Sequence, residues 1–251
     1  MSSAAAPSRR RPGARTLELY LWACALALAC VIFGEWPQLD LRVSALFVQP
    51  GFGFVGQQHG WVLALYKWVP WVTRAVGILL VILLCLWRLR VLRLSPAQLR
   101  RASALLFCLV VGTGLMVNGV LKETWGRPRP HEVQPFGGAL SFVPALVPSN
   151  LCSHNCSFVS GHAASGFALI GLGVFAAPAR RRYWVGVGLV AGFIVGLGRV
   201  MQGGHFASDI VFSGLVMWGC ALLLRWGWLR WRVRANRRRR ARSEALVRGG
   251  T

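Results

Sequence analysis

The chain has 251 residues, 55% of them hydrophobic, and it carries only 7 acidic residues against 29 lysines and arginines. Its long apolar runs exclude a soluble globular protein and indicate an integral membrane protein. The net charge of +22 would suit a nucleic-acid binder. However, the arginines gather near the two chain ends and beside apolar runs, which fits contact with anionic lipid at the cytoplasmic face. We therefore expect no nucleic-acid partner.

Six stretches are apolar enough for membrane-spanning helices, which need about 20 such residues. They are 17–34, 68–87, 102–121, 162–178, 183–198 and 207–224. The arginine-rich start before the first stretch resembles a signal peptide. No small-residue cleavage site follows it, so we interpret the stretch as a span that stays in the membrane. The sequence predicts an all-α six-transmembrane helix bundle.

Two other uncharged stretches contain helix breakers. Residues 43–66 include Pro50 and four glycines and are predicted to form an interfacial or re-entrant loop. Residues 133–149, with their prolines, either line the entrance of a site or form a simple interfacial belt. The membrane domain is thus expected to cover 17–224, between a basic N-terminus (1–16) and a basic, disordered tail (225–251).

Lysine and arginine are distributed unequally between the two sides of this predicted bundle. Between spans and at the chain ends, 22 lie on the side of the termini and six on the other side. Because positive residues favour the cytoplasm, both termini are predicted to be cytoplasmic. The opposite face would be the periplasmic face of a bacterial inner membrane.

Three polar islands fall on that opposite face, at 122–130, 157–163 and 199–209. Polar groups near a bilayer are costly and usually mark function. The islands contain a set of candidate site residues. They are Lys122, Arg127, Arg129, Ser160, Gly161, His162, Arg199, His205 and Asp209.

The third island has the clearest geometry. His205 and Asp209 are four positions apart and share a face if helical. The carboxylate can fix the imidazole tautomer and free the other nitrogen for attack. Alternatively, the pair only holds a loop to a helix. Likewise, Ser160 before His162 can serve an anion site or simply cap a helix.

The first island supplies Lys122, Arg127 and Arg129, which suit phosphate oxygens. Alternatively, these residues only extend their charges to the membrane interface. The other tools of phosphoryl transfer are missing: the sequence has no Gly-Lys-Ser/Thr loop and too few clustered carboxylates for a two-metal site. Histidine remains as the nucleophile, with no metal or other cofactor.

Spacing links the islands to a known family. The first island has the pattern Lys-x6-Arg-Pro, from Lys122 to Pro130. The second has Ser-Gly-His at 160–162, and the third has Arg-x5-His-x3-Asp at 199–209. Together they resemble the signature of the type 2 phosphatidic acid phosphatase superfamily, which includes the vanadium haloperoxidases. The stretch NCSFVSGHA is similar to bacterial lipid A phosphatases. Val159 and Gly198 depart from the family pattern, where proline and serine are usual.

The resemblance implies a role for each residue. His205 would attack phosphorus and form a phosphohistidine, Asp209 would orient it, and His162 would protonate the leaving oxygen. The remaining family positions would hold the phosphate oxygens: Lys122, Arg129, Ser160, Gly161 and Arg199. Arg127 does not stand at the arginine position of the motif, which Arg129 occupies, and it is not expected to contact phosphate.

The sequence thus predicts a phosphatase acting on a membrane lipid. Candidate substrates are lipid A, undecaprenyl pyrophosphate, phosphatidylglycerol phosphate and phosphatidic acid. The alternatives are a lipid-to-lipid phosphotransferase of the same fold and a non-catalytic lipid-phosphate carrier. A haem-binding site is a weaker interpretation of the two histidines, because it would leave the cations without a function. Cys152 and Cys156 could form a disulfide if their loop is periplasmic; a zinc site there lacks a second ligand pair. The oligomeric state stays open.

Overall fold

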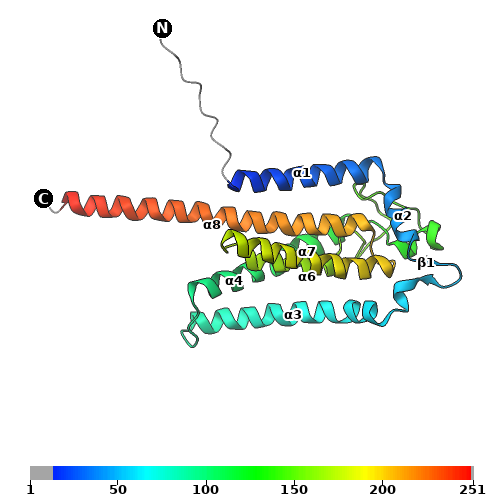
Figure 1. Ribbon diagram of the computed structural model, residues 1–251, viewed down its shortest axis with the longest axis horizontal. Coiled ribbons are helices and arrows are strands. Elements are labelled where there is room, and N and C mark those ends of the chain that lie inside the picture. The colour runs from blue at the N-terminus through cyan, green and yellow to red at the C-terminus, as the bar shows by residue number, and fades with distance from the viewer. Residues whose placement is uncertain (1–13, 250–251) are drawn as a thin grey trace, which may run out of the picture.

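The computed structural model describes residues 14–249, and the side chains of residues 17–238. Five helices in this part of the chain are long and apolar enough to cross a membrane. They lie side by side, with the chain passing up and down the bundle (Figure 1). These five are α1 (Ala14–Glu35), α3 (Gly60–Arg88), the continuous stretch Pro96–Thr124, α7 (Pro178–Met201) and α8 (Ala207–Gly249).

The stretch Pro96–Thr124 joins three helical segments. It comprises α4 (Pro96–Phe107), the π-helical η2 (Cys108–Leu121) and the short α5 (Lys122–Thr124). Ser95 caps α4 through a reciprocal hydrogen-bonded pair with Gln98. Lys122 therefore sits at the end of a helix that crosses the whole bundle.

The count of six full-length spans is not confirmed, because the predicted span 162–178 is much shorter. It consists of α6 (Gly161–Phe167) and the 3₁₀ helix η5 (Ala168–Gly173). Both are packed against α7 and are largely buried. Glycines allow this close packing: a Cβ on Gly166 would lie 2.7 Å from the backbone of Gly192. The segment therefore crosses the interior as a short, protein-covered element.

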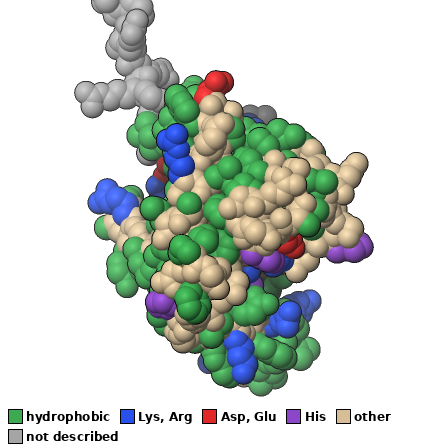
Figure 2. All heavy atoms as spheres, turned by 90° about the vertical axis from the view of Figure 1, so that its right-hand side faces the viewer, with side chains coloured by type: hydrophobic (Ala, Val, Ile, Leu, Met, Phe, Trp, Pro, Cys, Tyr) green, Lys and Arg blue, Asp and Glu red, His purple; other side chains and the backbone are tan. Residues whose placement is uncertain are grey.

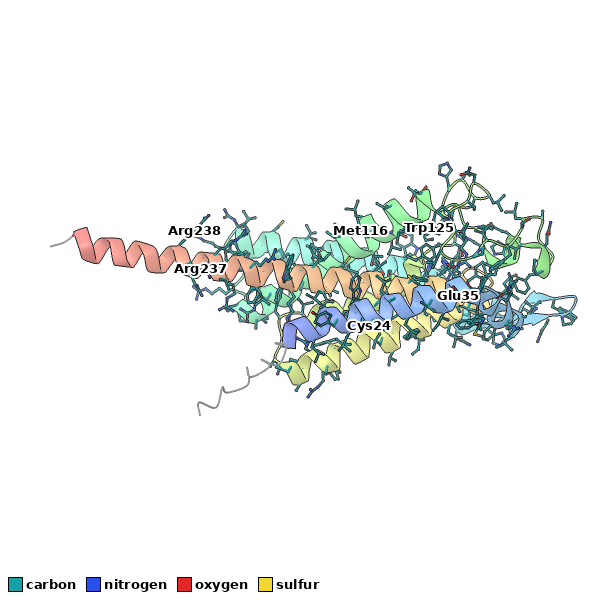
Figure 3. The ribbon with its side chains drawn as sticks, turned by 90° about the horizontal axis from the view of Figure 1, so that it is seen from above. Cys24, Glu35, Met116, Trp125, Arg237 and Arg238 are labelled. Carbon is teal, nitrogen blue, oxygen red and sulfur yellow. A yellow bond between two sulfur atoms is a disulfide. The ribbon has the colours of Figure 1, made fainter. Side chains whose placement is uncertain are left out.

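The two ends of the bundle differ in character. At one end, Glu18 of α1 forms ion pairs with Arg181 and Arg225. At the other end lie α2 (Gln38–Ala45), a two-stranded hairpin and the long loops. Figure 3 shows Glu35 and Trp125 at this loop-rich end and Arg237 and Arg238 beyond the opposite one. All three polar islands belong to the loop-rich end.

The hairpin and its flanks replace the loop predicted at 43–66. Strand β1 (Val48–Gln49) pairs with β2 (Gly53–Phe54), and the 3₁₀ turn η1 (Val55–Gln57) follows. Helix α3 then begins at Gly60, eight residues before the predicted start at residue 68. The early start matters because it brings Tyr66 into helical structure beside the site.

Helix α8 continues through residues 225–249, where the sequence predicts a disordered tail. No proline interrupts the segment, and arginine, leucine and alanine favour helix. The short 3₁₀ turns η3 (Pro130–Glu132) and η4 (Gln134–Phe136) complete the loop-rich end. Residues 1–13 of the predicted N-terminal segment lie outside the described residues.

Candidate active site

His205 lies in the turn between α7 and α8, with 1% of its surface exposed. Its Nδ1 atom is 2.7 Å from the carbonyl oxygen of Ser157. Because a carbonyl can only accept, Nδ1 carries the proton and Nε2 presents a lone pair. Within the described residues, Nε2 is buried and has no hydrogen-bond partner. Burial lowers the pKa of His205 well below its ordinary value, and the charges of Lys122 and Arg199 lower it further. The imidazole is therefore neutral, with Nε2 available to attack.

Asp209, in the first turn of α8, orients His205 less directly than the sequence suggests. Its Oδ2 atom is 3.5 Å from Nδ1 of His205. The same oxygen accepts hydrogen bonds from the Ser157 hydroxyl at 2.5 Å and the Phe206 amide at 2.8 Å. Asp209 thus fixes the segments on both sides of the ring, and the Ser157 carbonyl fixes the ring itself. Nothing in the sequence singled out Ser157 beyond its place in the second island.

Three cations, which we call the pocket cations, come from two of the islands: Lys122, Arg129 and Arg199. Lys122 Nζ donates to the side-chain oxygen of Asn155 at 2.8 Å, and Arg129 donates to its carbonyl at 2.7 Å. Arg199 donates to the Gln202 side chain. All these acceptors are neutral, and no ion pair involves the pocket cations within residues 17–238. Their charge is left for an anionic ligand.

His162 is held beside the pocket cations by Tyr66. Its Nε2 atom is 3.1 Å from the Tyr66 carbonyl oxygen, and the two rings stack with centroids 5.5 Å apart. Since the carbonyl accepts, Nε2 carries a proton and Nδ1 is the nitrogen left for proton transfer. The Arg199 guanidinium lies 4.7 Å from the Tyr66 ring centroid. Tyr66, which sequence reasoning missed, therefore joins two predicted site residues.

Ser160 and two glycines shape the surroundings of these side chains. The Ser160 hydroxyl accepts from the Ala163 amide at 3.4 Å, so it caps α6. A Cβ on Gly161 would lie 2.4 Å from the Asn118 side-chain oxygen. A Cβ on Gly204 would lie 2.2 Å from the Arg199 guanidinium. Glycine at both positions lets polar groups approach the backbone closely.

Behind His205 lies a second set of charges, which we call the buried ion cluster: Asp40, Arg127, Ser208 and Asp209. Arg127 is fully buried and donates to Asp40 at 2.7 Å and to Asp209 at 2.6 Å. Asp40 also accepts from the Ser208 amide at 2.9 Å and its hydroxyl at 2.5 Å. Arg127 is therefore not one of the pocket cations. Its partner Asp40 was missed, although the chain has only two aspartates and both bind Arg127.

The loops over the site are held to these clusters. Residues 133–149 supply the Val143 carbonyl, which accepts from Arg127 at 2.9 Å. A disulfide joins Cys152 and Cys156 and closes the loop that contains Asn155. The first loop thus covers the buried ion cluster, while the second carries the acceptor shared by two pocket cations.

Lys122, Gly161 and His162 also line one end of a groove of about 700 Å³. Viewed from the loop-rich end, histidine (purple) and basic (blue) side chains show together in a hollow, with an acidic side chain (red) beside them (Figure 2). Among the described residues, no three His, Cys, Asp or Glu side chains are close enough to share a metal ion. The arrangement combines a neutral imidazole, a second histidine and unpaired cations, which can bind and attack a phosphate.

Comparison with known proteins agrees with this chemistry. The family model of the PAP2 superfamily matches residues 103–234. The chain is 35% identical over 195 residues to a lipid A 4'-phosphatase of Francisella tularensis subsp. novicida, covering 76% of this chain and 86% of that protein. Lipid A 4'-phosphatases of Rhizobium leguminosarum and Rhizobium etli are 40% and 38% identical, each over 52% of this chain and over 57% and 52% of their own lengths. No solved structure matches.

Proposed function

The chain belongs to the PAP2 superfamily, and on that premise we propose that it is an integral membrane phosphatase that removes the 4'-phosphate of lipid A. One observation carries this proposal: the buried Nε2 of His205 has no partner within the described residues and lies beside cations with only neutral partners. A phosphate dianion would satisfy both. The curated relatives, all lipid A 4'-phosphatases, support the choice of lipid A.

The reaction would proceed in two displacements. The pocket cations hold the phosphate oxygens, and His205 Nε2 attacks phosphorus as the bond to the sugar oxygen breaks. The bound phosphate dianion offsets the neighbouring cations and favours the protonated form of His162, which gives a proton from Nδ1 to that leaving oxygen. A water then loses a proton to His162 and attacks the phosphohistidine, which releases inorganic phosphate and restores neutral His205. The cations supply the positive charge, so the mechanism needs no metal.

Charge distribution supports a place in the bacterial inner membrane. The arginine-rich ends of α3, α7 and α8 lie opposite the site, as expected if they face the cytoplasm. The site would then face the periplasm, with the acyl chains of the substrate in the bilayer. The arginines would contact anionic lipid headgroups on the cytoplasmic face.

Phosphate release from purified lipid phosphates tests the proposal. The panel contains lipid A, undecaprenyl pyrophosphate, phosphatidylglycerol phosphate and phosphatidic acid, each with and without EDTA. We expect lipid A to be the best substrate, EDTA to have no effect and His205→Ala to lose at least about a thousandfold of the rate. The matched control is His59→Ala, which removes an exposed histidine outside the site.

Several results would contradict the proposal. Full activity in His205→Ala would exclude the phosphohistidine, whereas no phosphate release from any lipid of the panel would fit a carrier. Loss in EDTA that added metal reverses would exclude metal independence. A newly phosphorylated lipid in place of inorganic phosphate would identify a phosphotransferase.

A further inference from the structure

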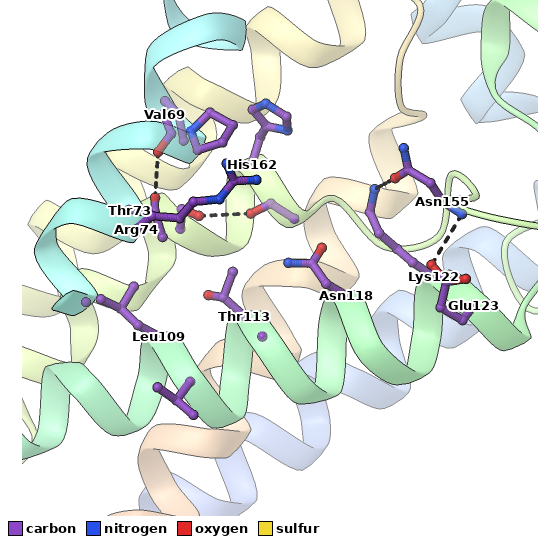
Figure 4. Close-up of a pocket in the computed structure, with 16 residues that line it drawn as sticks. Val69, Thr73, Arg74, Leu109, Thr113, Asn118, Lys122, Glu123, Asn155 and His162 are labelled. Atoms are coloured by element: carbon purple, nitrogen blue, oxygen red, sulfur yellow. Dashed lines mark hydrogen bonds between the residues drawn. The ribbon is translucent and has the colours of Figure 1, made fainter. Parts of the chain in front are cut away.

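The groove that begins at the site continues along the membrane-spanning helices. It runs between α3, η2 and α6, and it is lined by Lys122 and His162 at the site and by Gly77 and Leu109 farther along the spans. Figure 4 shows Lys122 and Leu109 toward opposite ends of the groove. Because it opens from the catalytic pocket into the spans, a lipid bound there would have its phosphate at the end nearest the site. The rest of that lipid would lie along the groove.

One lining residue is unexpected in such a place. Arg74 lies inside the span Gly60–Arg88 and is exposed in the groove. Charged residues within a span are costly and usually mark a ligand or ion pathway. Within the described residues Arg74 forms no ion pair or hydrogen bond, and its guanidinium lies 5.6 Å from the Trp71 ring. Arg181 and Arg225 at the opposite end of the bundle, and Arg127 in the buried ion cluster, by contrast have carboxylate partners.

The other polar side chains of the groove divide into two groups. Thr73 and Ser165 donate to carbonyls of their own helices, at 2.7 and 3.1 Å. The Thr113 hydroxyl faces the Met217 sulfur at 3.8 Å. Asn118, like Arg74, makes no side-chain hydrogen bond within the described residues. The groove therefore offers two unused donors, a guanidinium and an amide.

Both donors lie on the membrane side of the phosphate pocket. Arg74 is eight positions after Tyr66, whose carbonyl binds His162, and eight helical residues span about 12 Å. Side chains on a helix lean toward its N-terminus, which brings the guanidinium back toward His162. Asn118 is four positions before Lys122, about one turn, and Figure 4 shows both along the same helix beside the groove.

In a lipid, the atoms just below the headgroup phosphate are the oxygens that attach the acyl chains. We propose that Arg74 and Asn118 bind acyl-linkage oxygens of the substrate, which are ester or amide carbonyls and hydroxyls. This inference rests on the proposed function and sharpens it. Acylated lipids such as lipid A present these acceptors below the phosphate, whereas a polyprenyl phosphate continues as hydrocarbon. The two donors thus favour acylated substrates.

The test compares Arg74→Met and Asn118→Ala with Lys67→Met, which removes an exposed charge of the same helix outside the groove. The two probes are lipid A and p-nitrophenyl phosphate, which has no acyl linkage. Each charged hydrogen bond should be worth about 10- to 100-fold in kcat/KM. We expect Arg74→Met to lose that factor on lipid A, Asn118→Ala to lose less, and Lys67→Met to lose none. On p-nitrophenyl phosphate all three should match the wild type.

The outcomes separate the two proposals. A wild type that releases phosphate from neither probe would overturn the proposed function. An equal loss by Arg74→Met on both probes, or no loss on either, would overturn the role of Arg74 while leaving the phosphatase intact. A comparison of lipid A carrying one phosphate with lipid A carrying two tests a rival ligand for Arg74. A loss of kcat/KM in Arg74→Met confined to the doubly phosphorylated form would mean that Arg74 binds a second phosphate, and would overturn its proposed role. The thermal midpoint of each variant is measured in the same detergent, and Asn118→Ala carries the test if Arg74→Met is unfolded.

Discussion

The pocket cations and the buried ion cluster lie on two sides of His205, and they differ in whether their positive charge is neutralised by carboxylates. Arg127 in the cluster has two carboxylate partners within 2.7 Å. Lys122 and Arg129 share one neutral residue, Asn155, and Arg199 has Gln202. One set is neutralised inside the protein, whereas the other keeps its charge.

This difference separates the tasks of holding the site and of binding the substrate. A buried charge with all its partners is rigid, and removing one partner leaves another charge buried alone. Cations with neutral partners repel one another, but they stabilise a dianion and the charge that develops on phosphorus. The cluster should therefore determine stability and the pocket cations should determine activity.

Arg127→Met should have the largest effect and should act on stability. The change leaves the carboxylates of Asp40 and Asp209 buried without their shared partner. We expect the free energy of unfolding to fall by about 3–5 kcal/mol, measured by denaturation in detergent. Arg42→Met, an exposed arginine on the same helix as Asp40, is the control and should change little. A folded, fully stable Arg127→Met protein would contradict the stabilising role of the cluster.

Arg199→Met should show the reverse pattern. Loss of one donor to the phosphate should lower kcat about 100- to 1000-fold. The free energy of unfolding should change by less than about 1 kcal/mol, because only a neutral partner and a ring contact are lost. Activity assays and denaturation curves from one preparation measure both effects. A large loss of stability with little loss of activity would mean that the two sets of charges have been assigned the wrong tasks.

Sequence reasoning singled out histidines and cations that the structure brings together, and it missed the groups that hold them in place. His162, His205 and the pocket cations could be predicted, because an uncommon residue type at a fixed spacing carries the information. Asp40 could not, since its partner Arg127 lies 87 positions away. The backbone carbonyls of Ser157 and Tyr66 have no side-chain signature at all.

The fold shows the same division. Hydropathy predicts the position of α1, α3 and α7 because lipid-facing helices must be apolar throughout their length. It overestimates the span at 162–178 because a segment covered by protein is equally apolar but can be shorter. In the sequence Arg74 is only a charge inside a predicted span, and its place in the groove is visible only in the structure.

The protonation state of His205 predicts how stability depends on pH. Burial and the pocket cations lower the pKa of His205 well below 6.5 in the folded protein. The unfolded chain binds a proton there below its ordinary pKa of about 6.5, so acid favours unfolding. Replacing the residue by His205→Gln removes this penalty. Relative to the wild type, the variant should gain up to about 2 kcal/mol of stability between pH 7.5 and pH 5.

Denaturation of both proteins at the two pH values measures the gap, which is the free energy of unfolding of His205→Gln minus that of the wild type. An identical gap at both would mean that the folded and unfolded chains protonate His205 alike. A gap of opposite sign would mean that the folded site binds the proton more tightly. Either result would contradict a neutral nucleophile held by burial and by positive neighbours.

The smallest effect should come from the disulfide, which touches the pocket cations only through Asn155. Replacing both Cys152 and Cys156 by serine frees the loop that holds this acceptor beside Lys122 and Arg129. We expect KM to rise about two- to fivefold with kcat nearly unchanged, since less than one hydrogen bond's worth of free energy is lost. Asn155→Gly removes the amide but permits the left-handed backbone found there, with φ of 51°, so it should raise KM similarly. A fall in kcat as large as that of Arg199→Met would place Asn155 in the transition-state contacts instead. The disulfide also reports the side of the membrane on which this loop lies. Protein made by intact cells should contain the disulfide if the loop faces the periplasm, whereas a thiol pair facing the cytoplasm would stay reduced.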